Sequence, residues 1–537
     1  MKTNTLRLPV LSVLLLSEFA CDGEGDQRAD TAAEVADDTA IDATPEVSDD
    51  TSSPADTSSP ADAADSTPEV VPDTVTPALP NISEALDCGA GPPTGAGNQG
   101  ELQRYEVDTD LFPDALCNSG DPAVFFFRPA ADGSRDKWLI NLNGGGGCAS
   151  GPSCATRWCW CRSTGGPDGC PFAESTTNFS MGNMDGDNRA RINDGGIFLR
   201  GDPQRSNPLG NYNQVRVVYC SSDSWVGTRR AVPLVAPHPK TGVEVDFSVH
   251  FLGSRILDAV FTILRREGGA TPTYTLSGAP ALLPDLDDAA EVILSGDSGG
   301  GAGVIGNLDR VADLLRENNS ACQGSTCPLT VRGLIDAVVG PELEPLDFSE
   351  SFLAELGGST WADLLTFMAT VRDVNHGTRP DTSCDDWHRD RVPGPEACLD
   401  NTHVLRHHVT TPFFVRMALL DQLISGNYAE SGYRDPELGA FTPAVFAQVL
   451  RRELAAFGDL PTIAEEGEAM SLAPGVFAPA CTKHDTLHDD GEVYRTAITT
   501  AGQDLTLFDV FERWRDGTSP SIVTTSRMDL SDTFCAP

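Results

Sequence analysis

The sequence is poor in basic residues. Lys and Arg number 37 against 79 Asp and Glu in 537 residues, which gives a formal net charge of −42 at pH 7. Binding to nucleic acid depends on Lys and Arg that neutralise phosphates, so we expect no nucleic-acid partner. The shortage is greatest in residues 22–87, which hold no Lys, no aromatic residue, one Arg and eighteen Asp or Glu. Such a segment cannot bury enough apolar surface to fold, and we predict that it is a disordered acidic linker.

Long hydrophobic runs are also missing, apart from a short one at the N-terminus. Lys2 and Arg7 precede an apolar run over residues 8–16, which is too short to span a membrane and is typical of an export signal. Cys21 follows a small residue, as the lipid-bearing cysteine of a bacterial lipoprotein does. We predict a signal peptide over residues 1–20, a lipidated Cys21 that anchors the linker 21–87 to a membrane, and a folded domain over 88–537. Plain secretion is the alternative.

Cysteines are even in number once Cys21 is set aside. Fifteen minus one leaves fourteen, enough for seven disulfides in an oxidising compartment. Zinc binding is the alternative for one group, but the spacing of its members does not form a pair of C-x-x-C units and no histidine lies nearby. The group consists of Cys154, Cys159, Cys161 and Cys170. We expect disulfides, with no metal and no cofactor.

Strand-like and helix-like segments alternate from residue 88 onward. This order indicates an α/β fold with a mostly parallel central sheet and helices on both faces. The strand candidates are residues 138–142, 214–219, 292–295, 330–335 and 413–419, and the clearest helix candidates are residues 247–266 and 304–316. In such a sheet the functional groups lie beyond the carboxyl ends of the strands.

One strand candidate runs directly into the sequence Gly-Asp-Ser-Gly-Gly at residues 296–300, and an amphipathic helix follows it. This is the layout of a nucleophile elbow, a sharp turn that exposes the serine Oγ and places a helix N-terminus behind it. Glycines on both sides let two backbone segments approach closely. An ordinary strand-to-helix turn is the alternative, but the flanking strand and helix favour Ser298 as a nucleophile.

A serine nucleophile needs a histidine base and an acid that orients the histidine. Asp421 follows a strand candidate at its carboxyl end. The histidines after Ser298 are His376, His388, His403, His407, His408, His484 and His488. Composition does not choose among them, although His484 lies in a late loop that a disulfide of Cys481 could fix.

A glycine-rich loop, Asn143-Gly144-Gly145-Gly146-Gly147-Cys148, follows the first strand candidate. Lipases and esterases use such a loop because its backbone N–H groups can reach an oxyanion without obstruction by side chains. A phosphate-binding loop would need a following Gly-Lys-Ser/Thr, which is absent at this point, and a simple spacer is the remaining alternative.

Five blocks in order make the sequence resemble the pectin acetylesterase and Notum family of α/β-hydrolase carboxylesterases, nearer to the Notum branch. The blocks are residues 142–157, 218–227, 296–312, 412–421 and 477–484. Carried over by position, the resemblance implies Ser298 as the nucleophile, Asp421 as the acid and His484 as the base. It implies oxyanion donors at the N–H groups of Gly145, Gly146 and Gly299.

The resemblance also implies an extracytoplasmic serine esterase that removes an acetyl or longer acyl group from a polysaccharide or protein. A catalytically silent binding lipoprotein is the alternative. Asp223 and Trp225, in a loop after a strand candidate, are candidates to line the substrate pocket, and Asp297 adds negative charge beside the nucleophile. Gly146 replaces the tryptophan and Gly299 the alanine that the family usually carries, so the substrate does not transfer. We expect a monomer.

Overall fold

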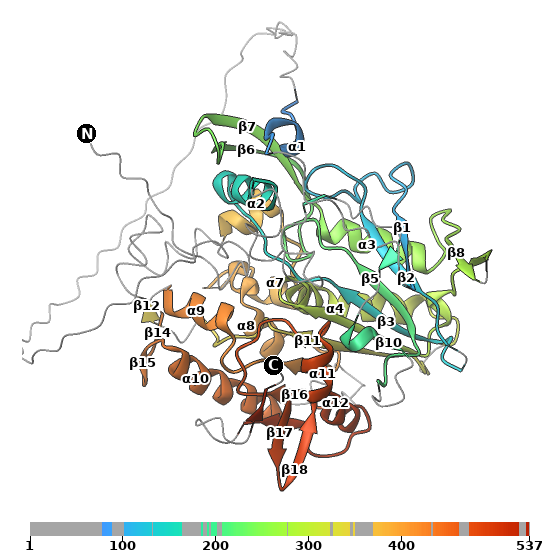
Figure 1. Cartoon of the computed structure of the whole chain (residues 1–537), viewed down its shortest axis with the longest axis vertical. Helices are drawn as coiled ribbons and strands as arrows, with labels where there is room; N and C mark the ends of the chain where they lie inside the picture. The colour runs from blue at the N-terminus through green and yellow to red at the C-terminus, as the bar shows by residue number, and fades with distance from the viewer. Residues whose placement is uncertain are drawn as a thin grey trace, which may run out of the picture. The chain divides into compact units, whose positions relative to one another are not determined.

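The structure is a computed structural model of the whole chain (Figure 1). It describes residues 78–88, 101–131, 133–163, 184–185, 191–192, 195–200, 207–276, 278–322, 326–343, 347–348, 369–391, 393–430, 433–460, 472–525 and 533–535. The predicted signal peptide, Cys21 and most of the predicted linker lie outside these residues. All the helices and strands named below belong to one compact unit of the chain.

A ten-stranded sheet forms the centre of this unit, in the order β19-β16-β13-β11-β10-β3-β5-β2-β1-β4. The strands from β19 to β5 run parallel to one another, and β2, β1 and β4 continue the sheet with antiparallel pairings. Their bounds are β1 (Leu102–Glu106), β2 (Val124–Arg128), β3 (Lys137–Leu142), β4 (Arg191–Ile192), β5 (Asn213–Val217), β10 (Glu291–Asp297), β11 (Thr330–Asp336), β13 (Phe413–Arg416), β16 (Gly475–Ala478) and β19 (Ile522–Thr524).

Successive residues of the strands face two separate hydrophobic cores. On β10, Val292 and Leu294 belong to one core and Ile293 to the other, and Phe413 and Phe414 of β13 are divided in the same way. Since both faces of the sheet are covered, its central strands are apolar on both sides. The apolar runs in the sequence are therefore the signature of this sheet.

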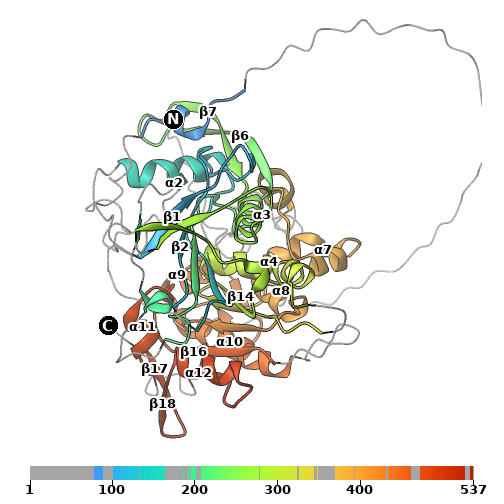
Figure 2. The same ribbon diagram turned by 90° about the vertical axis from the view of Figure 1, so that its right-hand side faces the viewer.

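Helices cover each face. Residues of α3, α4, α8 and α10 belong to the first core and residues of α11 and α12 to the second, and Figure 2 shows α3, α4 and α8 to one side of the strands and α11 to the other. The helices are α1 (Ile82–Ala85), α2 (Gly151–Ser163), α3 (Gly253–Leu264), α4 (Gly299–Asn318), α7 (Thr382–His388), α8 (Asn401–His407), α9 (Gln422–Glu430), α10 (Pro443–Ala456), α11 (Asp490–Arg495) and α12 (Leu507–Arg515), with short turns η1 (Gly196–Phe198), η2 (Leu286–Asp288), η3 (Val371–His376), η4 (Pro395–Leu399) and η5 (Phe457–Asp459).

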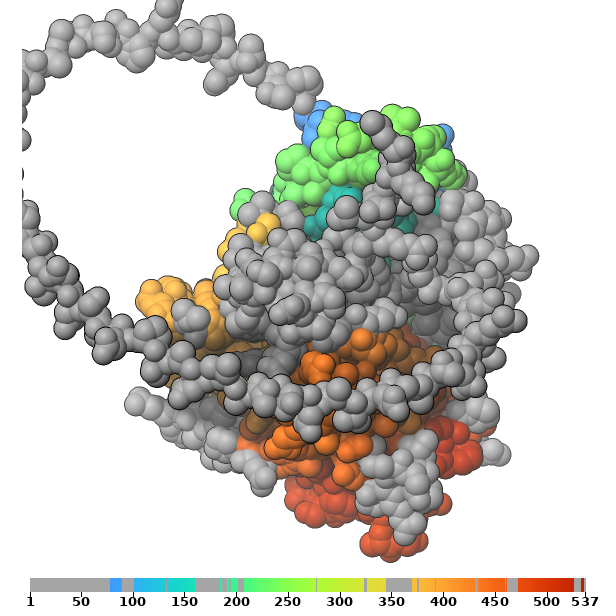
Figure 3. Space-filling model, turned by 90° about the vertical axis from the view of Figure 1, so that its left-hand side faces the viewer, coloured from blue at the N-terminus to red at the C-terminus, as the bar shows by residue number. Residues whose placement is uncertain are grey.

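Smaller strands decorate the periphery. They are β6 (Arg229–Pro237) and β7 (Glu244–Phe251), β8 (Thr273–Leu276) and β9 (Ala279–Leu282), β12 (Asp347–Phe348), β14 (Tyr433–Asp435) and β15 (Gly439–Ala440), and β17 (Ala497–Thr500), β18 (Gln503–Thr506) and β20 (Thr533–Phe534). In Figure 3 the β6–β7 hairpin (green) lies at one end of the visible face and the C-terminal elements (red) lie at the other.

The α/β fold with a mostly parallel sheet is confirmed, and all five strand candidates are strands, with ends shifted by a few residues. The helix predicted over residues 304–316 is part of α4. The helix predicted over residues 247–266 is wrong in its first part, because residues 247–251 belong to β7 and α3 begins only at Gly253. In this stretch Phe247, Val249 and Phe251 alternate along a strand that pairs with β6.

The folded unit begins before residue 88. Ile82 and Leu86 are buried at 0% and 1% exposure, and Asn81 forms a bridge to Ser248 of β7. The linker predicted to end at residue 87 therefore overlaps α1, because two apolar residues at its end pack on the hairpin. Among the described residues, no helix combines the length and the apolar character needed to cross a membrane.

Six disulfides join cysteines of the described part of the chain, as expected for an oxidising compartment. They are Cys88–Cys159, Cys117–Cys220, Cys148–Cys154, Cys322–Cys327, Cys384–Cys398 and Cys481–Cys535. Cys154 and Cys159, considered above as zinc ligands, are thus disulfide-bonded, and the side chains of Cys161 and Cys170 lie outside the described residues.

Candidate active site

The candidate site lies along one edge of the sheet, where the parallel strands end. β3 leads into the glycine-rich loop at residues 143–147, β10 leads to Ser298, β13 to Asp421 and β16 to His484. The ends of β10, β11 and β13 are paired residue by residue. Residues far apart in sequence are therefore brought to the same edge by the strand order.

Ser298 occupies a strained turn between β10 and α4. Its φ of 52° and ψ of −123° are unusual for a residue with a side chain, and its N–H donates to the carbonyl of Asp336 at 2.9 Å. A Cβ on Gly296 would lie 2.2 Å from the carbonyl oxygen of Gly300, and a Cβ on Gly300 would lie 1.9 Å from that of Leu142. The turn requires glycine at both positions, as the elbow pattern predicts.

Asp421 and His484 form a hydrogen-bonded pair. Nδ1 of His484 donates to Oδ2 of Asp421 at 2.8 Å. The other carboxylate oxygen, Oδ1, accepts the N–H groups of Leu423 and Ile424, both at 3.0 Å, at the start of α9. The acid is therefore held by its own helix, and it fixes the His484 tautomer that leaves Nε2 as a proton acceptor.

The electrostatics of this pair favour a charged imidazole. Burial lowers the pKa of His484, but the charge of Asp421 and its hydrogen bond outweigh burial and raise this pKa from 6.5 to about 9. A base must be neutral to accept a proton, so the same carboxylate that orients the ring also sets the pH above which the ring is a base.

Ser298 Oγ and His484 Nε2 are both buried, and neither has a hydrogen-bond partner among the residues that the structure describes. The structure thus brings Asp421 and His484 into contact but does not place the serine hydroxyl in a hydrogen bond with the ring. Buried polar atoms normally have partners, and exceptions gather at reactive sites. In unliganded enzymes the bond from nucleophile to base is often long and shortens when substrate binds.

The glycine-rich loop lies against the turn of Ser298. Gly145 has a φ of 146°, which favours glycine. A Cβ on Gly299 would lie 2.6 Å from the carbonyl oxygen of Gly145, so this loop position requires glycine at 299 as well. Among the described residues, no hydrogen-bond acceptor takes the N–H of Gly145 or Gly146. The roles of Gly145, Gly146 and Gly299 as oxyanion donors remain a prediction.

Asp297 is buried and connects the serine turn to the glycine-rich loop and to His488. Its carboxylate accepts the N–H of Gly144 at 3.2 Å through Oδ2 and contacts Nε2 of His488 at 3.2 Å through Oδ1. Only 2% of the residue is exposed. The negative charge that the sequence places beside the nucleophile is therefore buried, and this carboxylate attaches the glycine-rich loop to the turn.

Asp336, at the end of β11, is a further residue of the site that sequence reasoning did not find. Its Oδ2 accepts the N–H of Thr486 at 2.7 Å and its Oδ1 accepts from Arg416 at 3.2 Å, while its carbonyl holds the N–H of Ser298. Burial raises the pKa of Asp336 and the charge of Arg416 opposes this. One residue thus connects the nucleophile turn with the histidine loop. The sequence does contain a signal that could have identified Asp336, since this acidic residue directly follows the strand candidate at residues 330–335.

Asp223 and Trp225 hold the loop after β5. Asp223 accepts hydrogen bonds from the hydroxyl of Ser221 at 2.6 Å and from the N–H groups of Trp225 and Gly253 at 3.0 and 2.8 Å. The Trp225 indole donates to the carbonyl of Asn143 at 3.1 Å, in the glycine-rich loop. Both side chains are anchors of the loop. Asp223 also borders a small cavity, of about 40 Å³.

Among the histidines that sequence reasoning left open, His484 is the one that contacts Asp421. His376 is buried and bonded through Nε2 to the carbonyl of Cys148 at 2.8 Å, and burial lowers its pKa to about 4. A neutral His376 therefore braces the end of the glycine-rich loop. Four others gather on and around α7 and α8.

Comparison with known proteins gives one family and one group of relatives. The family model that matches residues 99–530 is described as Pectinacetylesterase. The palmitoleoyl-protein carboxylesterase Notum of Drosophila melanogaster is 31% identical over 222 residues, which are 41% of this chain and 26% of the fly protein. Its mouse counterpart is 30% identical over 221 residues, which are 41% of this chain and 33% of the mouse protein. The match thus spans a third or less of the length of these relatives.

A solved structure of the Wnt deacylase Notum from Drosophila has the same fold. It superimposes with a TM-score of 0.52 at 21% sequence identity and covers 80% of this chain and 97% of that chain. At this identity the likeness concerns the fold alone.

Proposed function

Because the chain belongs to the pectinacetylesterase family, we propose that it is an extracytoplasmic serine carboxylesterase. In this proposal it removes an O-linked acyl group, acetyl or longer, from a polysaccharide or protein ester. Two of the relatives are palmitoleoyl-protein carboxylesterases, and the structural neighbour is a Wnt deacylase. Their substrates are not carried over, since Gly146 and Gly299 differ from the family pattern.

The arrangement of Ser298, Asp421 and His484 is the main support for the proposal. The imidazole has its carboxylate partner at 2.8 Å on Nδ1, whereas Nε2 and the serine Oγ are buried without partners. A purely structural serine or histidine at such burial would have its polar atoms satisfied. Two unsatisfied groups at one sheet edge, beside a strained turn, are typical of a site that is completed by substrate.

The acylation step follows from these positions. Ser298 Oγ attacks the ester carbonyl carbon while Nε2 of His484 accepts the hydroxyl proton, and Asp421 stabilises the imidazolium that forms. The negative charge that develops on the carbonyl oxygen is stabilised by the N–H groups of Gly145, Gly146 and Gly299. When the tetrahedral intermediate collapses, the alcohol leaves with the proton from His484 and the acyl group stays on Ser298.

The second step releases the acyl group. Water donates a proton to the neutral His484 and attacks the acyl carbonyl, and the protonated ring then returns the proton to Ser298 Oγ as the carboxylic acid departs. Both steps require His484 to begin unprotonated. The chain's own residues supply every proton transfer in this scheme.

The predicted location is compatible with this chemistry. Six disulfides in the described residues are typical of a protein that matures outside the cytoplasm. In the proposal Cys21 carries the lipid and the acidic linker extends the enzyme from the membrane towards acylated polymers or proteins. Labelling of cells with a fatty-acid analogue, compared between the natural chain and Cys21→Ser, tests the anchor.

A series of p-nitrophenyl esters from acetyl to palmitoyl tests the catalytic proposal. We expect turnover with at least part of the series, and the chain length with the highest kcat/KM reports the depth of the acyl pocket. A fluorophosphonate probe should label the protein at Ser298. If no ester is hydrolysed and no label is attached, the proposal is wrong, and a binding protein on a hydrolase fold takes its place.

A further inference from the structure

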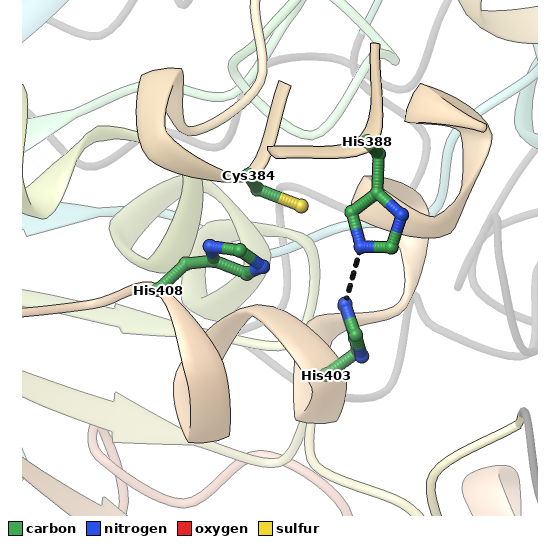
Figure 4. A group of neighbouring side chains, drawn as sticks. All are labelled: Cys384, His388, His403 and His408. Carbon is green, nitrogen blue, oxygen red and sulfur yellow. Dashed lines mark hydrogen bonds between the residues drawn. The ribbon is translucent and has the colours of Figure 1, made fainter. Parts of the chain in front are cut away.

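Four histidines and a disulfide gather at α7 and α8, and none of these residues belongs to the serine turn. His388 ends α7, His403 lies within α8, and His407 and His408 follow at the end of α8. His388, His403 and His408 are exposed by only 5%, 9% and 7%. Figure 4 shows these three rings and Cys384 directed towards one another. The triad does not use any of these side chains.

The hydrogen bonds of His388 and His403 determine their tautomers. Nδ1 of His388 lies 2.9 Å from the carbonyl oxygen of Pro393, which only accepts, so this nitrogen carries the proton. Nδ1 of His403 lies 3.0 Å from Oε1 of Glu342, and it is likewise the donor to this carboxylate. Glu342 also accepts from Arg406 at 2.7 Å, which keeps it ionised. In both neutral rings the lone pair therefore sits on Nε2.

The Nδ1 of His408 is also a donor, in this case to the hydroxyl group of Ser383. This nitrogen lies 3.1 Å from Oγ of Ser383, and that hydroxyl has a shorter contact, 2.8 Å, to the carboxylate of Asp381. The Ser383 hydroxyl donates to Asp381, so His408 Nδ1–H donates to Ser383 and Nε2 keeps the lone pair. All three rings thus use Nδ1 as a donor to a fixed acceptor. This pattern is the one in which proteins orient metal-binding histidines.

The Nε2 atoms meet. Those of His388 and His403 are 2.9 Å apart, and the ligand atoms of His388, His403, His408 and Cys384 all lie within 4.8 Å of one another. Two lone pairs that face each other at this distance need a cation between them. Two Zn–N bonds of about 2.0–2.1 Å place their nitrogens about 2.9 Å apart at a right angle and about 3.3 Å apart at the tetrahedral angle. We propose that His388, His403 and His408 bind a divalent transition-metal ion of the zinc class through Nε2.

A proton shared by two rings would also fit a 2.9 Å contact, but it would leave the third ring unexplained. A metal ion uses all three imidazoles at once and takes water as a fourth ligand. Cys384 is disulfide-bonded to Cys398, so its sulfur offers no thiolate. A ligand set of neutral imidazoles suits Zn²⁺, Cu²⁺ or Ni²⁺ and does not suit Mg²⁺ or Ca²⁺.

The ion would join α7 to α8, whereas the disulfide already joins α7 to η4. Cys384 and His388 lie on α7, Cys398 lies on η4, and His403 and His408 lie on and after α8. Val404 and Leu405 of α8 belong to the same buried core as α4, the helix behind Ser298. The site is therefore a second cross-link of the helical segment that packs on the nucleophile helix.

Metal content of the full chain, purified with its disulfides formed and without chelators, is the first test. We expect one Zn²⁺ per chain after loading and removal of excess metal, and binding that competes with a chromophoric zinc indicator. Loading with Co²⁺ should give the visible bands of a nitrogen-ligated ion without a thiolate charge-transfer band. Substoichiometric binding, or a thiolate band, would overturn the proposal. These readouts need no variant and do not depend on esterase activity.

Matched variants then locate the ion. Glu342→Gln, which removes the carboxylate that orients His403, should weaken Zn²⁺ binding by about 10–100-fold. His388→Gln and His408→Gln should each weaken Zn²⁺ binding by more than this. His238→Gln, in the turn beside β6, should bind as the natural chain does. His407→Gln should also keep the ion, although His407 lies 3.3 Å from Glu342. If His407→Gln loses the ion and His408→Gln retains it, the three-histidine assignment is wrong.

Discussion

Two histidines of this molecule begin from the same arrangement and differ in what they face. His484 and His403 each donate from Nδ1 to a buried carboxylate, Asp421 at 2.8 Å and Glu342 at 3.0 Å. The Nε2 of His484 is buried without a partner at the serine turn, whereas that of His403 meets a second imidazole at 2.9 Å. A carboxylate on Nδ1 therefore fixes the tautomer in both places, and the group opposite Nε2 decides between proton transfer and metal binding.

The loop of His484 and the histidine cluster at α7 and α8 are also held in place by different parts of the fold. His484 lies in a loop that continues a strand of the main sheet, and Cys481, three residues earlier, is disulfide-bonded to Cys535. The histidine cluster lies on and directly after two short helices, and the disulfide between Cys384 and Cys398 joins the first helix to the turn η4 that precedes the second. The first region takes its geometry from the sheet, and the second takes it from local cross-links. Perturbations of one region should therefore leave the readout of the other intact.

The largest effect should follow the removal of the nucleophile. Ser298→Ala should lower kcat on p-nitrophenyl esters by about 10⁶-fold, because the attacking oxygen is gone. Zn²⁺ stoichiometry should not change, since the cluster shares no residue with the serine turn. Parallel assays of ester hydrolysis and metal content measure both. Full activity in this variant would remove Ser298 from the proposed mechanism.

The next largest effect should follow a change of the acid. Asp421→Asn should lower kcat by about 10⁴-fold, because the amide no longer holds the required tautomer. In the natural protein the folded pKa of His484 is raised to about 9, so kcat/KM should rise with pH through this value as the ring loses its proton. Without the charge of Asp421 burial dominates, and the acidic limb of the variant should move to lower pH. Profiles of kcat/KM against pH measure this, and an unshifted limb would contradict the assignment.

A smaller effect should follow Gly299→Ala. The added Cβ would lie 2.6 Å from the carbonyl oxygen of Gly145, so the glycine-rich loop must move. A displacement of this kind should lower kcat by about 10- to 100-fold with a smaller effect on KM. Gly426→Ala is a matched control, because its added Cβ meets nothing within 4 Å. Equal kcat in the two variants would show that the loop tolerates the methyl group.

The smallest effect should follow the removal of metal. A chelator should lower the midpoint of thermal unfolding by a few degrees, since loss of a ligand at about 100 times its Kd costs about 2.7 kcal/mol. Ester hydrolysis well below the transition should change little, because the proposed mechanism uses none of the three histidines. Differential scanning calorimetry with and without Zn²⁺ measures the shift. His408→Gln should show no response to either treatment.

The parts of the molecule that sequence predicted well are those with local signatures. The turn at Ser298 follows from glycines whose absent Cβ atoms make room for Gly300 and Leu142, and this requirement is visible in the sequence itself. The central strands are apolar because both faces are covered, so they were identifiable as runs. Asp421 could be named because it follows such a run. The choice of His484 came from a family resemblance.

The parts that sequence did not predict depend on contacts between distant segments. The sequence places the charge of Asp297 beside the nucleophile, and only the contact with Gly144 shows that this carboxylate holds the glycine-rich loop. Residues 247–251 looked helical, because their apolar spacing continues into α3, but pairing with β6 makes them a strand. His388, His403 and His408 span 20 residues without a metal-binding spacing, and the fold of α7 against α8 is what brings their rings together.

If the proposed function holds, Asp336 has a consequence for how such an enzyme acquires new substrates. Its carbonyl holds the turn of the nucleophile and its carboxylate holds the loop of the base, so any replacement would disturb two catalytic positions in one mutational step. Substitutions that change the substrate preference are therefore expected at positions that Asp336 does not contact, such as the glycine-rich loop and the small cavity beside Asp223. The reacting groups can be inherited unchanged while the acyl preference drifts.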